Sequence, residues 1–190
     1  MFTFRESDHS YWLDARRLDG VTEILRDAGM VNGSWFTEES RTRGTYVHAA
    51  TEMIDKGSLD WTALDPVLLP YCQAYQKFVE DKRPVILLSE KHLYHAVHLY
   101  AGTPDRVVTL DGATALIDLK TGVPAPATAI QVAAYRELVR VNEDIIPAKC
   151  FSLHLRDDGT YRLAEINDLR RHFNIFLAAL TVVRWRRENL

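Results

Sequence analysis

The stretch GTPDRVVTLDGATALIDLKTG, from Gly102 to Gly122, decides the fold because it places charged residues inside otherwise apolar segments. Residues 107–110 and 113–119 predict two strands joined by a tight turn at Asp111-Gly112, since Asp-Gly between apolar runs is a strong hairpin signal. Side chains alternate between the two faces of a strand. The second strand should therefore present Ile117 and Leu119 on one face and its charged residues on the other.

Two charged residues, Asp118 and Lys120, stand two positions apart on that second strand and so share a face. Asp105 precedes the first strand and can lie opposite them across the hairpin. Two carboxylates that converge on one point repel each other unless a cation or a proton lies between them. Oxygen ligands with room for water suit Mg²⁺ or Mn²⁺, and a lysine beside such an ion can stabilise charge on a phosphate.

These residues carry a resemblance. Pro104-Asp105 followed by Asp118-Leu119-Lys120 resembles the paired-acid and D-x-K signature of the PD-(D/E)XK nuclease superfamily. Gly44-x-x-x-His48 upstream and Gln131-x-x-x-Tyr135 downstream are similar to motifs of its RecB-like branch, which includes phage recombination exonucleases. The likeness spans residues 41–140 and rests on the order of its motifs, because a D-x-K triplet by itself is common.

The resemblance implies an α/β fold with a restriction-endonuclease-like core, in which a mixed central sheet is flanked by helices. It implies hydrolysis of DNA phosphodiester bonds with one or two Mg²⁺ or Mn²⁺ ions. Lys120 would orient or activate the attacking water. Glu90 is either a further ligand or an exposed acid at a strand end. The implied metal ligands are His48, Asp105, Asp118 and the main-chain carbonyl of Leu119.

A helix predicted over residues 128–141 carries Gln131 and Tyr135 on one face, because residues four apart are neighbours on a helix. The resemblance implies that this face covers the metal pocket. Gln131 would then hold a phosphate oxygen or a water, and Tyr135 would position Lys120 or the scissile phosphate. Ordinary helix polarity and a core tyrosine are the plainer interpretation of the same two residues.

An upstream helix predicted over residues 37–56 carries the candidate DNA-binding residues Arg41 and Arg43, next to Gly44 and His48. Gly44 would allow another backbone or DNA to approach closely. A hydrogen-bonded core histidine and surface arginines are the plainer alternatives. The net charge of −3 does not itself indicate nucleic-acid binding. Further basic clusters, each equally compatible with a solvated surface, are Arg16-Arg17, Arg170-Arg171 and Arg184-x-Arg186-Arg187.

The length of 190 residues and a hydrophobic content of 47% fit a single domain with a real core. We divide it into an N-terminal hairpin and short helix over 1–36, a catalytic core over 37–166 and a C-terminal helix over 167–190. No membrane-spanning segment or signal peptide is expected, so a cytoplasmic location in a bacterial or phage-infected cell is predicted. Cys72 and Cys150 predict core thiols and cannot supply the four thiolates of an iron–sulfur cluster, so none is expected.

Turn and capping signals predict the remaining elements. Thr22, Thr37 and Asp65 are the expected helix N-caps. His92, His95 and His98 match no zinc spacing and are expected to be exposed. The predicted elements are hairpins over 2–4 with 11–13 and over 149–155 with 161–166, helices over 23–28, 65–82 and 168–187, and a strand over 85–94.

Four functions remain open at this point. An exonuclease acting on DNA ends in recombination, repair or phage DNA processing is the first choice, because the members it most resembles process DNA ends. A structure-selective or single-strand endonuclease and a hydrolase of small phosphoesters use the same metal chemistry. A non-catalytic DNA-binding subunit belongs to another class. DNA is the expected partner, together with a single-strand annealing protein, a helicase or a second copy of the chain.

Overall fold

The predicted hairpin lies within a five-stranded mixed sheet in the computed structural model, which describes residues 1–31 and 38–190. β7 (Arg106–Leu110) and β8 (Ala113–Lys120) are antiparallel. Both turn residues have positive φ, 49° at Asp111 and 77° at Gly112, as a tight hairpin turn requires. β8 pairs in parallel with β9 (Lys149–Leu155) on its other side. The sheet order is β10-β9-β8-β7-β4, with β10 at Tyr161–Glu165 and β4 at Val85–Ser89.

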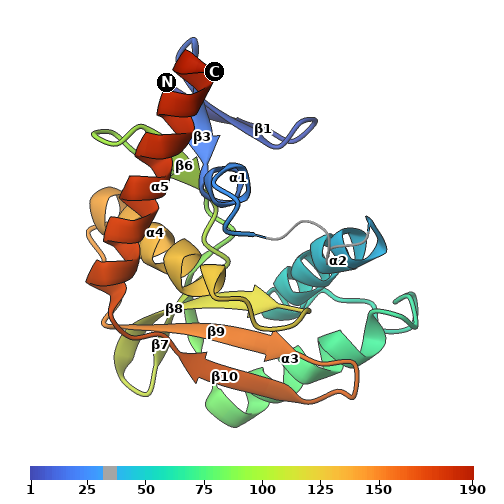
Figure 1. Cartoon of the computed structure of the whole chain (residues 1–190). Coiled ribbons are helices and arrows are strands. Elements are labelled where there is room, and N and C mark those ends of the chain that lie inside the picture. The colour runs from blue at the N-terminus through green and yellow to red at the C-terminus, as the bar shows by residue number, and fades with distance from the viewer. Residues whose placement is uncertain (32–37) are drawn as a thin grey trace.

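Helices cover both faces of this larger sheet (Figure 1). Leu116 packs in a core with α1, α4 and α5, whereas its neighbours Ile117 and Leu119 pack in a second core with α2 and α3. The predicted alternation along β8 is therefore correct, and the predicted α/β fold with helices flanking a mixed sheet is confirmed. The helices are α1 (Val21–Asp27), α2 (Glu38–Asp55), α3 (Leu69–Lys82), α4 (Ala127–Asn142) and α5 (Leu169–Asn189).

A second, smaller sheet extends the predicted N-terminal hairpin. Its order is β1-β2-β3-β6-β5. β3 and β6 are parallel, and every other neighbouring pair in this sheet is antiparallel. Tyr11, Leu18 and Ala101 form its own small core. Its strands are β1 (Phe2–Arg5), β2 (Ser10–Leu13), β3 (Arg16–Gly20), β5 (Leu93–His95) and β6 (Tyr100–Gly102).

The single strand predicted over residues 85–94 is wrong, because Glu90 adopts a left-handed conformation with φ of 46° and interrupts it. β4 stays in the larger sheet, and β5 joins the smaller one. The chain returns to the larger sheet between β6 and β7. We name residues 90–92 and 103–105 together the sheet crossing. The Glu90 N–H donates to the Asp105 carbonyl at 3.0 Å, so the two passages lie side by side.

Three predicted helix starts differ from the structure or fall outside it. Thr22 lies inside α1, whose N-cap is Gly20, and the Gly20 N–H donates to Glu23 Oε2 at 3.3 Å. Asp65 begins a turn, where its Oδ1 accepts the Val67 N–H at 2.9 Å, but α3 itself begins only at Leu69. The predicted cap Thr37 lies outside the described residues. The capping signals therefore lie within a few residues of the helix starts but do not identify the first residue of each helix.

The predicted exposure of the histidines is wrong for His95, which is only 7% exposed. Its Nδ1 accepts the backbone N–H groups of Val97 and His98, so local bonds satisfy it in the interior. Cys72 and Cys150 are free and buried, as predicted for core thiols. Burial raises the pKa of Cys72 to about 11 and that of Cys150 to about 12. Within residues 1–31 and 38–190, we find no helix that combines the length and apolar character needed to cross a membrane.

Candidate metal centre

His48, Glu90 and Asp105 converge at the sheet crossing, and we name them the triad. One donor atom from each lies within 4.8 Å of the others. His48 projects from α2, with its Nδ1 3.4 Å from Glu90 Oε1 and 3.5 Å from Asp105 Oδ1. The two acids come from the two adjacent passages between the sheets. Residues separated by more than forty positions on α2 and the crossing are therefore brought to one point.

The acids of the triad control its charge. Burial by itself lowers the pKa of His48, but Asp105 and Glu90 outweigh burial and raise it to about 10. Burial would raise the pKa of the Asp105 carboxyl, but the positive charges of His48 and Lys120 hold it below its usual value. The neighbouring carboxylates thus favour the protonated, cationic forms of the groups beside them, as expected because close carboxylates repel each other without a counter-charge.

Asp118 and Lys120 share one face of β8, as predicted, and Lys120 Nζ lies 2.6 Å from Asp118 Oδ2. Burial raises the pKa of Asp118 to about 6, with Lys120 opposing and Asp105 reinforcing the shift. Burial would lower the pKa of Lys120, but Asp118 and Asp105 raise it above its usual value and keep the ammonium charged. Asp105 also reaches across the hairpin, where its Oδ2 accepts the Leu119 N–H at 2.6 Å.

The donor set fits a hard divalent cation. Asp118 is 1% exposed; its Oδ2 is paired with Lys120 Nζ, but its Oδ1 has no hydrogen-bond partner among the described residues. A buried acceptor without a donor is costly, so such a group calls for a cation or a solvent molecule. Carboxylate oxygens with one imidazole suit Mg²⁺ or Mn²⁺. The carbonyl of Leu119 stays a predicted ligand.

Gln131 and Tyr135 share the predicted face of α4 and connect to β8. Lys120 Nζ donates to Gln131 Oε1 at 3.1 Å, and Gln131 Nε2 donates to the Tyr135 hydroxyl at 3.1 Å. Gln131 therefore contacts the lysine directly, while Tyr135 acts on it through Gln131. The Tyr135 ring lies against Gly102, where an added Cβ would be 2.6 Å from Tyr135 Cε1. Gly102 is thus required for this close approach.

Arg106 was not among the predicted site residues, although it is 1% exposed and contacts both triad acids. Its Nη1 donates to Glu90 Oε1 at 3.1 Å and to the Asp105 carbonyl at 2.7 Å. Its other nitrogens donate to Asp55 Oδ2 at 2.5 Å and Thr51 Oγ1 at 3.3 Å on α2. The guanidinium therefore ties α2 to the sheet crossing. The available sequence signal was an arginine at the start of an apolar strand, directly after a candidate acid.

Two clefts meet at this centre. The first has a volume of about 600 Å³ and is walled by the smaller sheet and α1, and the second has about 690 Å³ and is walled by α2 and residues 121–125. Asp105 lines the first cleft, whereas Asp118 lines neither cleft and is more deeply buried than Asp105. The residues that line both clefts are His9, Thr22, Arg26, His48, Glu90, Lys120 and Gln131.

The predicted DNA-binding arginines have different positions. Arg41 lines the second cleft. Arg43 lines neither, and its guanidinium lies over the Tyr71 ring, 5.3 Å from the centroid. Arg26, which was not predicted, lines both clefts. Gly44 lines the second cleft, but the heavy atom nearest to an added Cβ is Thr121 Oγ1 at 3.8 Å, so among the described residues no backbone of another element packs tightly against it.

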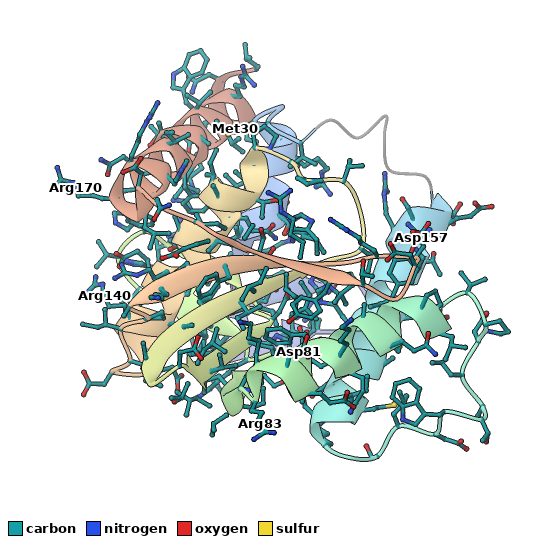
Figure 2. The ribbon with its side chains drawn as sticks, turned by 90° about the horizontal axis from the view of Figure 1, so that it is seen from below. Met30, Asp81, Arg83, Arg140, Asp157 and Arg170 are labelled. Carbon is teal, nitrogen blue, oxygen red and sulfur yellow. The ribbon has the colours of Figure 1, made fainter. Side chains whose placement is uncertain are left out.

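The other basic clusters lie mostly away from the clefts. Arg184 and Arg187 form ion pairs with Asp19 at 2.8 and 2.5 Å, which hold α5 to β3. Arg170 lines neither cleft and projects from the surface near the start of α5 (Figure 2). Arg17 does line the first cleft, where it pairs with Glu23 at 3.1 Å. Most residues of these basic clusters are thus either structural or solvated.

Comparison with known proteins identifies a structural likeness only. The chain matches no protein-family model, and no curated protein is similar to it in sequence. A protein of Eubacterium rectale that is provisionally named an exonuclease is 14% identical, with a TM-score of 0.57 over 87% of this chain and 79% of that one. An alkaline exonuclease of Laribacter hongkongensis is 15% identical, with a TM-score of 0.43 over 89% of this chain and 91% of that one. The first likeness shows that this chain and the Eubacterium protein share a fold.

Proposed function

We propose that this protein is a divalent-metal-dependent DNA nuclease of the PD-(D/E)XK superfamily, and most specifically an exonuclease of the RecB-like branch. The observation that carries the proposal is the convergence of His48, Glu90 and Asp105 within 4.8 Å, beside the Lys120–Asp118 pair. These residues come from four segments of the chain and meet where two clefts join. The Eubacterium protein that shares this fold is provisionally named an exonuclease, in agreement with the proposal.

Each residue has a definite task in this proposal. The triad would hold the ion, and Asp118 would add carboxylate oxygens. When bound, Mg²⁺ or Mn²⁺ lowers the pKa of a bound water and stabilises charge on a phosphate. Lys120, which Asp118 and Gln131 hold in place, would donate to the attacking water or a phosphate oxygen. Gln131 and Tyr135 would fix the direction of that donor. Arg106 would keep Glu90 oriented.

The two clefts favour a polynucleotide over a small phosphoester. They share the triad residues His48 and Glu90, so a strand bound at the centre can continue on both sides. Arg26 lines both clefts and Arg41 the second, where each can contact a phosphate. A single-strand annealing protein, a helicase or a second copy of the chain would supply the further basic surface that a DNA backbone needs.

Cleavage of end-labelled linear DNA, compared with a covalently closed circle, tests the proposal. Both substrates are incubated with Mg²⁺, Mn²⁺ or EDTA, using wild type, Lys120→Ala and the matched control Lys149→Ala, which changes an exposed lysine at the start of the neighbouring strand. We expect metal-dependent loss of linear DNA alone, absent in Lys120→Ala and retained in the control. Cleavage of the circle as well would reassign the protein as an endonuclease. Full activity of Lys120→Ala would refute the mechanism.

A further inference from the structure

A stack of aromatic rings lines the first cleft next to the triad. The Phe4 and His92 rings lie 3.9 Å apart between centroids, at an interplanar angle of 25°. Both residues line the cleft, and His92 is exposed there while Phe4 is half-buried. His9 and Tyr11 flank Phe4, with ring centroids 4.9 and 5.1 Å from it. The cleft thus contains an accessible aromatic surface that none of the metal chemistry requires.

The same chain segments carry the ring stack and the triad acids. His92 follows Glu90 by two residues, and Thr103 precedes Asp105 by two. His92 Nδ1 lies 2.7 Å from Thr103 Oγ1, which joins the two passages of the sheet crossing a second time. Two residues of extended chain span at most about 7 Å. The stack is therefore held at a short and fixed distance from the acids, on the scale of a single nucleotide.

We propose that the His92–Phe4 stack binds an unpaired nucleobase of the DNA strand whose phosphate lies at the triad. The inference rests on the proposed function and specifies its substrate as a single-stranded or frayed DNA end. Every base has a π-face, so stacking on an aromatic ring is tolerant of sequence. A base inside a duplex is already stacked on its neighbours, and it must leave the duplex to reach the ring. The cleft volume of about 600 Å³ lies in the range of small-ligand sites.

Phe2 shows what a purely structural aromatic residue looks like on the same strand. It shares the face of β1 with Phe4 because the two are two residues apart. Its ring stacks on Tyr94 with centroids 4.8 Å apart, and it lines neither cleft. Packing of the smaller sheet accounts for Phe2. It does not account for the exposed His92 ring in the cleft, which makes Phe2 the matched control for Phe4.

The experiment measures the affinity of short single-stranded oligonucleotides by fluorescence anisotropy, in EDTA and in Ca²⁺. Each oligonucleotide carries one abasic site at the first, second or third position from either end. For wild type, we expect one position to lose affinity on the order of 10-fold when its base is removed. That loss disappears in His92→Leu and shrinks in Phe4→Leu. It persists in His92→Phe, which keeps an aromatic ring without the bond to Thr103, and in Phe2→Leu.

Each other outcome overturns the proposal. An unchanged abasic penalty in His92→Leu, or no penalty at any position of wild type, excludes stacking while leaving the nuclease proposal intact. Equal behaviour of His92→Phe and His92→Leu would assign the effect to the hydrogen bond with Thr103. Neither binding nor cleavage of any DNA by wild type would overturn the proposed function, and this inference with it.

Discussion

The β7–β8 hairpin and the sheet crossing both supply groups to the candidate metal centre, but they assemble them differently. The hairpin presents Asp118 and Lys120 from one strand, 2.6 Å apart, by the alternation of side chains alone. The crossing presents Glu90 and Asp105 from passages between two sheets, and His48 joins them from a separate helix. The first arrangement is local, whereas the second exists only when both sheets and α2 are in place.

The two regions also balance their acids differently. In the hairpin, the buried Asp118 has Lys120 two residues away. At the crossing, the buried guanidinium of Arg106 contacts Glu90 and the Asp105 carbonyl, and it is itself paired with Asp55. The crossing therefore depends on a network of buried charges from distant segments. This difference predicts that substitution of Arg106 or of the acids at the crossing will disturb stability and metal binding, and that substitution of Lys120 in the hairpin will disturb chemistry.

The largest expected effect on stability comes from Arg106→Met. The change leaves the Asp55 side chain, which is 7% exposed, without its cationic partner, and only the Tyr75 hydroxyl still donates to it. Removing one member of a buried pair typically costs about 3–5 kcal/mol of unfolding free energy. Urea denaturation measures it, and Arg140→Met, which breaks an exposed pair with Glu137, is the control with about 0–1 kcal/mol. A loss as small as that of the control would mean that the crossing does not need Arg106.

Lys120→Met and Glu90→Gln should change different quantities. Lys120→Met lowers the cleavage rate at saturating Mn²⁺ by about 10²–10³-fold, because it removes a donor to developing charge. Glu90→Gln lowers the affinity for Mn²⁺ by at least about 10–100-fold, which is the loss that removal of a group around a metal site typically causes. Titration calorimetry with Mn²⁺ and cleavage at saturating metal separate the two. Asp111→Asn, at the exposed turn, is the control for both. If the two variants lost the same Mn²⁺ affinity and the same cleavage rate, the hairpin and the crossing would not have separate roles in chemistry and metal binding.

Gly102→Ala tests the packing between α4 and the end of β6, next to the crossing. An added Cβ would lie 2.6 Å from Tyr135 Cε1 and 3.2 Å from Leu138 Cδ1. Overpacking a tight core costs about 1–3 kcal/mol. Gly122→Ala is the matched control, since an added Cβ there meets nothing within 4 Å. Thermal or urea unfolding compares the two variants. Equal stability of both would show that the Tyr135 ring moves aside at no cost.

Gly112→Ala should have the smallest effect and remain confined to the hairpin. Gly112 has φ of 77°, and a residue with a Cβ pays about 1–2 kcal/mol to adopt the left-handed region. Pairing of β8 with β9 holds the register of Asp118 and Lys120 independently of the turn. The free energy of unfolding should therefore fall while the cleavage rate at saturating metal stays unchanged. A fall in cleavage as well would mean that the turn sets the geometry of the Asp118–Lys120 pair.

Particular residues show which features of the fold and the candidate site could be predicted from the sequence. The Asp-Gly turn, the alternation along β8 and the shared face of Gln131 and Tyr135 all follow from fixed periods of 2 and 3.6 residues. Residues 85–94, which include Glu90, were predicted as one strand, because nothing in the neighbours of Glu90 indicates a left-handed residue between two sheets. Arg43 was predicted on the candidate DNA-binding surface, yet it packs on Tyr71 of another helix. His95 was predicted to be exposed, yet it is buried.

The sequence by itself determined the hairpin with Asp118 and Lys120, because the Asp-Gly turn and the alternation of side chains are local features. The fold class followed from the resemblance of its ordered motifs to a nuclease superfamily. Only the tertiary structure decided that Glu90 joins His48 and Asp105, that Arg106 is buried among acids, and that two clefts meet at the centre. The physical reason is that membership of a sheet and burial of a charge depend on contacts between residues far apart in the chain.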